Sequence, residues 1–450
     1  MKSFFAIVFL GLLVLTGLAR LIQPAPAPAG RIPLVWASDD NPTRRDQIAL
    51  FNRTNPQYWL ALDPLVPNTE KIVVQAIGGV GPDLFDCYSG AQLAGYVRSG
   101  VAWDITDRLK GMGIDVQRDL WRATDGNILR DGRVYGFPTN AAVNAMWLHR
   151  EIFEQEGVQI PAGTMKWPEF VTLAERMTKR NSAGKVERFG FVMDWDNNWY
   201  QFVLQWGGRM YSPDGTQVLI DGPEAIAGLQ FMQDLIWRYH VSPSPAEEEM
   251  MATQGGWGSG AITWFGGRRA AIALGGRWWL NLLRTYPGLN LGAVECPIHD
   301  RKVYLGYGRA TLINSKSPHR EAALAFLAYM ASKPYNDLVN HQADAVSPVR
   351  KYCYSPEFLH DPEFPKEDYN AVWRDVMDYG VPFDESPFVN GNVVERLLKK
   401  QRDLVKANQK TAADGFRTGA RQIRAAMRET LERDPVLRAR YLKLTGGRLP

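Results

Sequence analysis

Short apolar segments alternate with amphipathic ones along the first part of this chain, and this alternation most restricts the folds open to it. Residues 34–36 form an apolar run of strand type, a polar turn follows, and residues 43–52 space their apolar side chains as a helix does. Further strand-type runs lie at 58–62 and 81–85. Repetition of strand, polar turn and helix predicts an α/β fold, because each strand is then followed by a helix that can cover its sheet.

Helical spacing recurs further along. Residues 167–180 and 322–330 each place their apolar side chains on one face. Asp221, with Glu224 three residues later, predicts a capped helix start. Residues 401–431 predict one long charged helix near the end of the chain. The simplest explanation of its many Arg and Lys residues is a helix face exposed to solvent. The alternative is a surface that binds a membrane or a partner.

The N-terminal 29 residues have the pattern of an export signal. Residues 4–19 are uncharged and apolar, and a Pro/Ala-rich spacer follows up to Ala29. The run is slightly short for a membrane span, which needs about 20 residues, and fits a signal peptide. Ala27-Pro28-Ala29 has the small-x-small form of a cleavage site. Residues 1–29 are therefore predicted to be a signal peptide or an uncleaved membrane anchor, and in both cases the body is exported to the periplasm or the extracellular space.

Charge and cysteine content exclude several classes of protein. The 450 residues include 52 Lys and Arg against 48 Asp and Glu, a balance that argues against a nucleic-acid partner. Cys87, Cys296 and Cys353 lie far apart and form neither a disulfide framework nor a paired metal motif. Free, buried thiols are expected, and a single bridge stays open.

Sequence motifs for catalysis are missing. The six histidines include no HExxH pair, and neither a G-x-S-x-G elbow nor a phosphate-binding G-x-x-x-x-G-K-[ST] loop occurs. Adjacent acids such as Asp39 and Asp40 point in different directions, which weakens a glycosidase interpretation. The missing motifs argue against a metal enzyme, a serine hydrolase and an NTPase, and no metal or cofactor is expected. A secreted enzyme that uses an Asp/Glu pair stays open as an alternative.

Tryptophan is unusually abundant, with 15 residues. Many tryptophans suggest an aromatic-lined surface or cleft, because the indole is large and keeps a polar edge. Trp278 follows Gly275-Gly276-Arg277 in a stretch rich in glycine and aromatic residues, and is the best candidate for a stacking platform. Trp199 is a weaker second candidate, and a place in the core is the alternative for both.

Nine short motifs follow one another through residues 31–350. In chain order they are Leu34-Val35-Trp36, Ala49-Leu50-Phe51-Asn52-Arg53-Thr54-Asn55-Pro56, Gly81-Pro82-Asp83-Leu84-Phe85, Tyr135-Gly136-Phe137-Pro138, Trp167-Pro168-Glu169-Phe170, Trp206-Gly207-Gly208, Phe265-Gly266-Gly267-Arg268-Arg269-Ala270-Ala271-Ile272, Ala323-Leu324-Ala325-Phe326-Leu327 and Val346-Ser347-Pro348-Val349-Arg350. In this order and spacing the chain resembles the extracellular solute-binding proteins of sugar-importing ABC systems, family 1, of the maltose-binding type.

The resemblance implies an α/β fold of two lobes, discontinuous in sequence, joined by a hinge. One lobe would comprise 31–140 plus 306–347 and the other 141–305 plus 348–450. The chain would cross between them near Thr139–Val143, Tyr304–Gly308 and Val346–Arg350. The implied function is to bind a sugar or oligosaccharide, close the lobes and deliver the ligand to an ABC permease, as a monomer. A tethered sugar-sensing partner of a membrane receptor fits the same fold.

Loops after the strand ends of such sheets line the ligand crevice, and their carboxylates and amides can bond sugar hydroxyls. Ordinary turn capping is the alternative for Ser38, Asp40 and Asp86. Arg277 and Arg309 would reach hydroxyls or an acidic sugar, with a surface salt bridge as the equal alternative. The predicted ligand-binding set is Trp36, Ser38, Asp40, Asp86, Tyr88, Asn140, Trp199, Arg277, Trp278, Tyr307 and Arg309.

Overall fold

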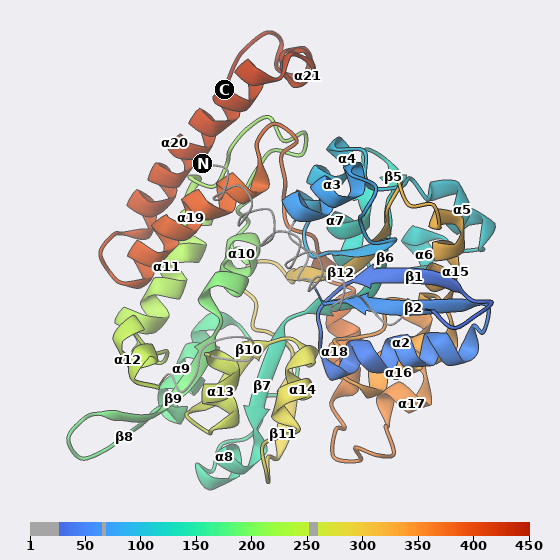
Figure 1. The fold of residues 1–450 in the computed structure, drawn as a ribbon. Coiled ribbons are helices and arrows are strands. Elements are labelled where there is room, and N and C mark those ends of the chain that lie inside the picture. The colour runs from blue at the N-terminus through green and yellow to red at the C-terminus, as the bar shows by residue number, and fades with distance from the viewer. Residues whose placement is uncertain (1–26, 65–68, 252–259) are drawn as a thin grey trace, which may run out of the picture.

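The computed structural model describes residues 27–64, 69–251 and 260–450 and has two α/β lobes, each built on its own β-sheet (Figure 1). The sheet of the first lobe has the strand order β13 (Gly380–Val381), β12 (Tyr304–Ile313), β3 (Leu84–Cys87), β1 (Ile32–Ala37) and β2 (Tyr58–Asp63), and β6 (Gly136–Val143) also pairs with β12. The sheet of the second lobe has the order β11 (Leu291–Val294), β7 (Ala145–His149), β10 (Ala270–Gly275), β9 (Val186–Met193) and β8 (Lys179–Arg180). A small hairpin joins β4 (Leu129–Arg130) and β5 (Arg133–Val134). The predicted two-lobed α/β fold is confirmed.

Helices cover both sheets. Around the first sheet lie α2 (Pro42–Thr54), α3 (Thr69–Ile77), α4 (Gly90–Arg98), α5 (Thr106–Gly111), α6 (Val116–Asp119), α7 (Asp125–Ile128), α15 (Arg320–Met330) and α16 (Lys333–His341), with the 3-10 turn η1 (Arg122–Thr124). The segment made of η3 (Arg350–Tyr354), α17 (Pro356–Leu359) and α18 (Asn370–Met377) lies where the two sheets meet, because α18 contacts β6 and β12 as well as β7, and its Trp373 ring packs 4.7 Å from the Trp147 ring of β7. Around the second lie α8 (Arg150–Gln155), α9 (Trp167–Met177), α10 (Trp195–Gln205), α11 (Pro223–Trp237), α12 (Pro245–Met251), α13 (Ala261–Gly266), η2 (Arg277–Trp279) and α14 (Leu280–Leu283). The C-terminal helices α19 (Gly391–Lys406), α20 (Ala412–Arg433) and α21 (Pro435–Thr445) follow.

The opening strand–helix–strand unit forms as the sequence predicts. β1 pairs in parallel with β2 on one side and with β3 on the other. Helix α2 starts where the Asn41 side chain accepts a hydrogen bond from the Arg44 backbone N–H, with Pro42 in the first turn. Its buried Phe51 meets the ring of Phe326 from α15 edge-on at 5.2 Å. The first lobe thus buries aromatic side chains that are far apart in sequence.

Two local predictions were wrong. Gly222, not Asp221, occupies the cap of α11 and makes no side-chain cap bond. The Asp221 carboxylate instead pairs with Arg424 of α20 at 2.8 Å, so a tertiary ion pair replaces the local cap. The long helix expected over 401–431 is divided into α19 and α20, because the chain turns between them and Asn408 adopts a positive φ of 56°.

The three segments predicted as crossings lie beside one another. β6 pairs antiparallel with β12, with Asn140 opposite Arg309. Ala141 of β6 also forms an isolated bridge with Val346. β6 belongs to the first sheet and β7, which begins after Asn144, to the second, so the chain passes between the lobes at this point. The lobe boundaries and the hinge function of these segments stay predictions.

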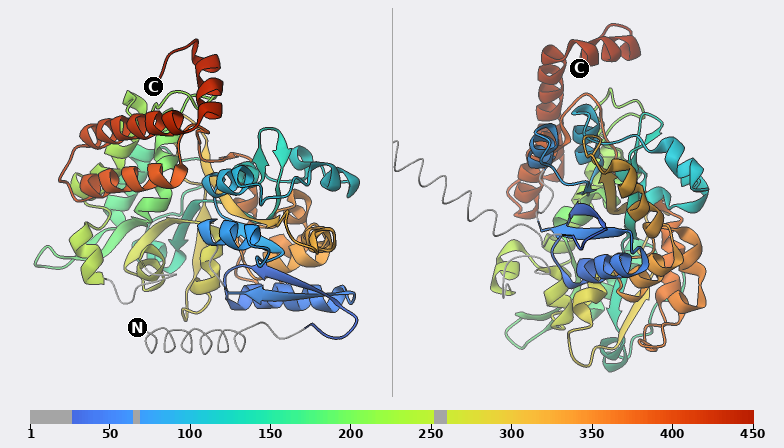
Figure 2. Two further views of the ribbon diagram at one scale, coloured as in Figure 1. Left: turned by 45° about the horizontal axis from the view of Figure 1, so that its top comes forward. Right: turned by 45° about the vertical axis from the view of Figure 1, so that its right-hand side comes forward.

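The C-terminal helices pack on the second lobe. α19 and α20 lie side by side (Figure 2) and contact α11, and Arg402 of α19 and Phe416 of α20 lie against the Trp199 ring of α10. α20 buries Phe416, Ala420, Ile423 and Met427 along one face. The Tyr441 hydroxyl of α21 donates to the Thr216 carbonyl oxygen at 2.9 Å. The end of the chain is therefore part of the folded body.

Between residue 27 and the C-terminus, the described segments include no helix that is both long and apolar enough to span a membrane. The export signal predicted for residues 1–29 falls almost wholly outside the described residues. Cys87, Cys296 and Cys353 are all buried and free.

Candidate ligand-binding cavity

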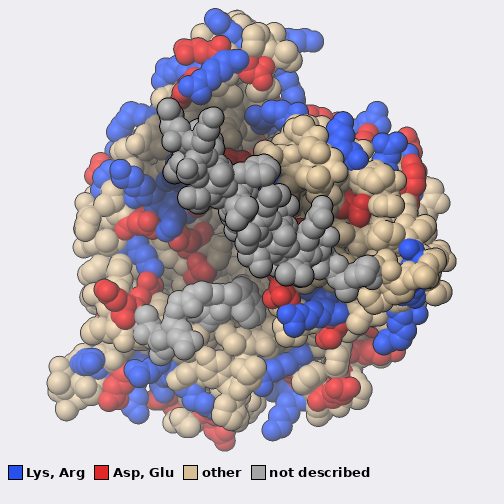
Figure 3. All heavy atoms as spheres, in the orientation of Figure 1, with Lys and Arg blue, Asp and Glu red and all other residues tan. Residues whose placement is uncertain are grey.

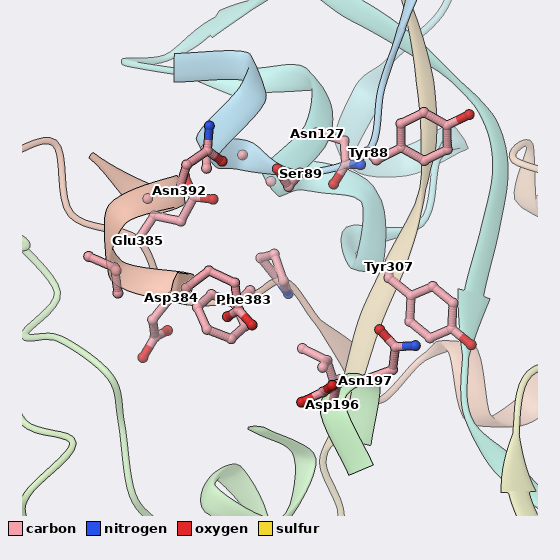
Figure 4. A pocket seen from close by; sticks show the side chains of 18 of the residues that line it. Tyr88, Ser89, Asn127, Asp196, Asn197, Tyr307, Phe383, Asp384, Glu385 and Asn392 are labelled. Carbon is pink, nitrogen blue, oxygen red and sulfur yellow. The ribbon is translucent and has the colours of Figure 1, made fainter. Parts of the chain in front are cut away.

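A cavity of about 1140 Å³ lies between the two lobes. Both lobes, the crossing strand β12 and the segment before α19 contribute to its wall (Figure 4). Its polar and aromatic lining includes Tyr88, Ser89, Asn127, Asn144, Asp194, Asp196, Asn197, Asn198, Trp199, Trp278, Tyr307, Phe383, Asp384, Glu385 and Asn392. A cavity of this size holds a ligand of several rings, since sites for drug-sized molecules are about 300–1000 Å³.

The first lobe supplies the wall formed by the end of β3 and the start of α4. Ser89 caps α4 by accepting a hydrogen bond from the Gln92 backbone N–H at 3.2 Å. Tyr88 precedes it, is 37 % exposed, and donates its hydroxyl hydrogen to Asp39 at 2.7 Å. The Asn127 side chain is held in position because its amide donates a hydrogen bond to the carbonyl oxygen of Gly308 at 2.9 Å. This wall offers one aromatic ring with polar groups beside it.

A chain of hydrogen bonds lines the cavity where the lobes meet. The Trp278 indole N–H donates to the Tyr307 hydroxyl at 3.1 Å, and that hydroxyl donates to the Asn144 side-chain oxygen. The Asn144 amide donates in turn to Asn198 at 2.5 Å. Burial raises the pKa of Tyr307, so its phenol stays protonated. The chain fixes the donors and acceptors of this part of the wall before any ligand arrives.

The second lobe contributes the first turn of α10. Asp194 caps this helix by accepting from the backbone N–H groups of Asp196 and Asn197. The Asp196 carboxylate pairs with Lys399 of α19 at 2.7 Å. Trp199 is only 3 % exposed, and the Arg402 guanidinium lies 4.6 Å from its ring centre. Trp199 is therefore largely packed and presents little surface to the cavity.

The segment after β13 closes a further side. Asp384 pairs with Arg209 at 2.5 Å. Glu385 reaches the first lobe, where its carboxylate lies 3.6 Å from the Arg130 guanidinium and a Cβ on Gly90 would come within 2.5 Å of it. Burial raises the pKa of Glu385 to about 7, although Arg130 acts in the opposite direction. A side chain at position 90 would therefore have to displace the Glu385 carboxylate.

Four of the predicted ligand-binding residues lie on the cavity wall: Tyr88, Trp199, Trp278 and Tyr307. The other seven lie outside the lining: Trp36, Ser38, Asp40, Asp86, Asn140, Arg277 and Arg309. Contact of any of them with a ligand stays a prediction.

Asp86 is the centre of a buried network behind Tyr88. It accepts hydrogen bonds from the Trp36 indole at 2.9 Å, the Ser38 hydroxyl at 2.5 Å and the Thr311 hydroxyl at 2.8 Å. Arg309 lies 3.2 Å away. Burial raises the pKa of Asp86, while Arg309 and the hydroxyl donors act against the rise. These contacts join β1, β3 and β12, so the network holds the first sheet together.

A second carboxylate continues the network. Asp344 lies 2.6 Å from Arg44 and 3.7 Å from Arg309, and the Asn140 amide donates to it at 3.1 Å. Burial by itself would raise its pKa, but Arg44 and Arg309 outweigh burial and lower the pKa of Asp344 to about 2. Arg309 and Asn140 thus connect buried segments.

The remaining two residues are also engaged elsewhere. Buried Arg277 donates to Asn370 and to the carbonyl oxygens of Asn340 and Ala345, each at 2.9 Å. Asp40 is exposed and pairs with Arg45 at 2.8 Å. Neither arginine of the predicted set is therefore displayed on the cavity wall.

Several lining residues were not predicted. Asn144 is a polar residue between two strand-type runs, and that interruption is a signal the sequence does carry. Phe383, Asp384 and Glu385 belong to no motif, and only the return of the chain after β13 brings them to the cavity. Among the described residues, no group of three or more His, Cys, Asp or Glu side chains is placed to hold a metal ion.

The sequence of this chain matches one family of known proteins. The family model described as "Bacterial extracellular solute-binding protein" matches residues 66–337. Among curated proteins, an arabinooligosaccharide-binding protein of Halalkalibacterium halodurans is 28% identical over 210 residues, which are 44% of this chain and 44% of that protein. A putative binding protein of Brucella abortus is 23% identical over 237 residues, 50% of this chain and 54% of that protein. The match thus spans about half the length of these curated relatives.

Solved structures resemble the whole fold. An ABC substrate-binding protein from Listeria monocytogenes, in complex with cycloalternan, aligns with a TM-score of 0.74 at 18% identity and covers 88% of this chain and 99% of its own. The sugar-binding protein MalE from Xanthomonas citri aligns with a TM-score of 0.73 at 14% identity, over 88% and 97% of the two chains. At these identities the likeness establishes the fold.

Proposed function

This chain belongs to the bacterial extracellular solute-binding proteins, and we propose that it is the substrate-binding component of an ABC importer for a sugar or oligosaccharide. The observation that carries the proposal is the interlobe cavity of about 1140 Å³, whose wall combines aromatic rings with fixed hydrogen-bonding groups. Sugar rings have an apolar C–H face and a polar rim, and such a wall can pack the first while bonding the second. The relative from Halalkalibacterium halodurans, described as binding arabinooligosaccharide, supports the ligand class.

Ligand contacts fall into two kinds in this proposal. Trp278 and Tyr88 pack against sugar rings from opposite lobes, while Asn127, Asn144 and Tyr307 bond hydroxyls. A closed form then gains contacts from both lobes only when a ligand is present, so binding favours closure. The closed protein delivers the sugar to the permease subunits.

A thermal-shift screen of the purified protein over a library of mono- and oligosaccharides tests the proposal. Binding raises stability by RT ln(1 + [L]/Kd), which is about 2.7 kcal/mol at a hundred-fold excess of ligand over Kd. A rise in melting temperature for at least one sugar supports the proposal. If no sugar across mono-, di- and oligosaccharides shifts the melt, the assigned ligand class is wrong.

The same sugar distinguishes binding from turnover. Membership of a family of binding proteins argues for a ligand that is released unchanged. Chromatography of the sugar after prolonged incubation with the protein should return it intact. Hydrolysis products that appear in proportion to protein concentration would establish the rival enzyme function.

A further inference from the structure

The C-terminal helices carry a concentration of positive charge that the cavity does not use. Residues 391–450 contain fifteen Lys and Arg against six Asp and Glu, a net charge of +9, whereas the whole chain has +4. The rest of the chain is therefore negative overall. Charge asymmetry of this kind indicates an interaction with an anionic surface. In Figure 3, blue side chains surround the top of the molecule, where α20 and α21 lie, with a few red ones among them.

Arginines form a straight stripe along α20. Arg417, Arg421, Arg424 and Arg428 follow one another at spacings of four, three and four residues, which places them on one helical face. Arg424 pairs with Asp221 at 2.8 Å. Arg417, Arg421 and Arg428 are exposed, and no ion pair engages them among the described residues. The opposite face of α20 packs into the core, so the stripe is held on a fixed support.

Exposed apolar side chains accompany the charge at the end of the chain. Val436 is 79 % exposed, Leu444 is 48 % exposed and Leu449 is 51 % exposed. On α21, Lys443 follows Val436 by seven residues and Leu444 follows it by eight, so all three fall within one broad stripe of the helix. These aliphatic groups give the cationic end of the chain a small apolar surface in addition to its charge.

We propose that α20 and α21 dock the protein on the surface of an anionic phospholipid bilayer. A bilayer offers what this surface matches: an extended array of phosphate groups for the arginine stripe, and a shallow apolar layer for Val436, Leu444 and Leu449. The 22-residue helix α20 presents its arginines along one exposed face, and an extended face of this kind suits a flat surface. Docking would hold the second lobe at the membrane in which the permease resides.

Vesicle co-sedimentation of the full chain tests this inference. The probes are vesicles of phosphatidylcholine alone and of phosphatidylcholine with phosphatidylglycerol, each at low and at physiological salt. The quantity compared is the gain in binding from the anionic lipid, because any insertion of the N-terminal apolar run occurs in both kinds of vesicle. We expect anionic vesicles to bind more protein, and added salt to reduce the gain.

Two triple variants with equal charge make the test specific. The first replaces Arg417, Arg421 and Arg428 by Ser and keeps the Arg424–Asp221 pair. The control replaces Arg53, Lys110 and Lys185, three exposed cations far from α20 in the fold, by Ser. One cation near an anionic bilayer contributes roughly fivefold in binding, so the stripe variant should lose roughly 100-fold of the gain. The control should keep it.

Melting temperature and sugar affinity check that both variants fold and keep their cavity. If both variants lost the same share of their binding to anionic vesicles, net charge alone would explain the binding, and the proposal would be overturned. No gain from the anionic lipid would overturn it as well, and would leave an acidic protein partner as the use of the stripe. The sugar measurement is separate, so failure of the lipid test leaves the proposed transport function untouched.

Discussion

Trp278 and Tyr307 join the two lobes at the cavity, where the indole N–H of the first donates to the hydroxyl of the second at 3.1 Å. Trp278 belongs to η2, next to the second sheet, and Tyr307 belongs to β12, which pairs within the first sheet. Gly276 is necessary for this approach, since a Cβ there would collide with the Tyr307 hydroxyl. The bond holds the indole in place and leaves its ring to line the cavity.

Replacing Trp278 by Ala should weaken sugar binding by roughly 2–4 kcal/mol, the range of an interface hot spot. The reason is that one ring packs much of the apolar face of a sugar. Calorimetric titration and thermal melting of the same variant measure affinity and stability separately. Unchanged affinity together with a loss of roughly 3–5 kcal/mol in folding stability would make Trp278 a core residue instead.

Asp86→Ala should destabilise the protein by roughly 3–5 kcal/mol, because it leaves the buried Arg309 guanidinium without its nearest carboxylate. Asp40→Ala is the matched control, since it breaks an exposed pair whose contribution is about 0–1 kcal/mol. Urea unfolding of both variants gives the comparison. If Asp86→Ala keeps its stability but loses sugar affinity, the sequence-based prediction of a ligand contact holds and the structural role fails.

Glu385 should make stability fall as the pH rises. Its pKa is about 7 in the folded protein against an ordinary value of 4.5, so between these values the folded protein holds a proton that the unfolded chain releases. The loss of stability from pH 5 to pH 8 should be roughly 2–3 kcal/mol, which follows from a pKa of about 7 in the folded protein against 4.5 in the unfolded chain.

Glu385→Gln tests this pH dependence, because the amide does not titrate. Denaturant unfolding at pH 5 and pH 8 should show a smaller decline for this variant than for the unaltered protein. Glu70→Gln, at an exposed carboxylate on another part of the rim, should decline as the unaltered protein does. Parallel curves for all three proteins would rule out Glu385 as the titrating group.

Sugar binding should make the protein more compact. Lobes joined by adjacent crossing segments can rotate toward each other, and contacts from both lobes stabilise the closed form. Small-angle scattering with and without the sugar identified in the thermal screen should show a smaller radius of gyration in the bound state. An unchanged radius at saturating sugar would indicate a rigid binder.

The protein should be found outside the cytoplasm. The uncharged run at residues 4–19 motivates export, and fractionation of native cells measures it. Sequencing of the mature N-terminus then separates cleavage after Ala29 from an uncleaved anchor. A pool confined to the cytosol with its first residues intact would contradict the prediction.

The local pattern of apolar and polar residues predicted most of the strands and helices named from the sequence. The strand-type run at 34–36 lies within β1, and the helical spacing at 43–52 lies within α2, because a strand or a helix with one apolar face is specified by its own residues. The order of these elements and of the motifs also predicted the family and its two-lobed fold. The Asp221 cap and the long helix over 401–431 failed where a partner far away in the sequence, or a tight turn, decided the outcome.

The side of the wall on which each polar residue lies was decided only by the tertiary structure. Asp86 and Tyr88 are two residues apart, yet Tyr88 lines the cavity and Asp86 is fully buried. The difference arises because Thr311, which follows 225 residues later on β12, and Arg309 cover Asp86. Sequence determines that a strand ends in polar residues. Which of them faces the cavity depends on the neighbouring strand, since an uncovered carboxylate is solvated and a covered one must find donors within the protein.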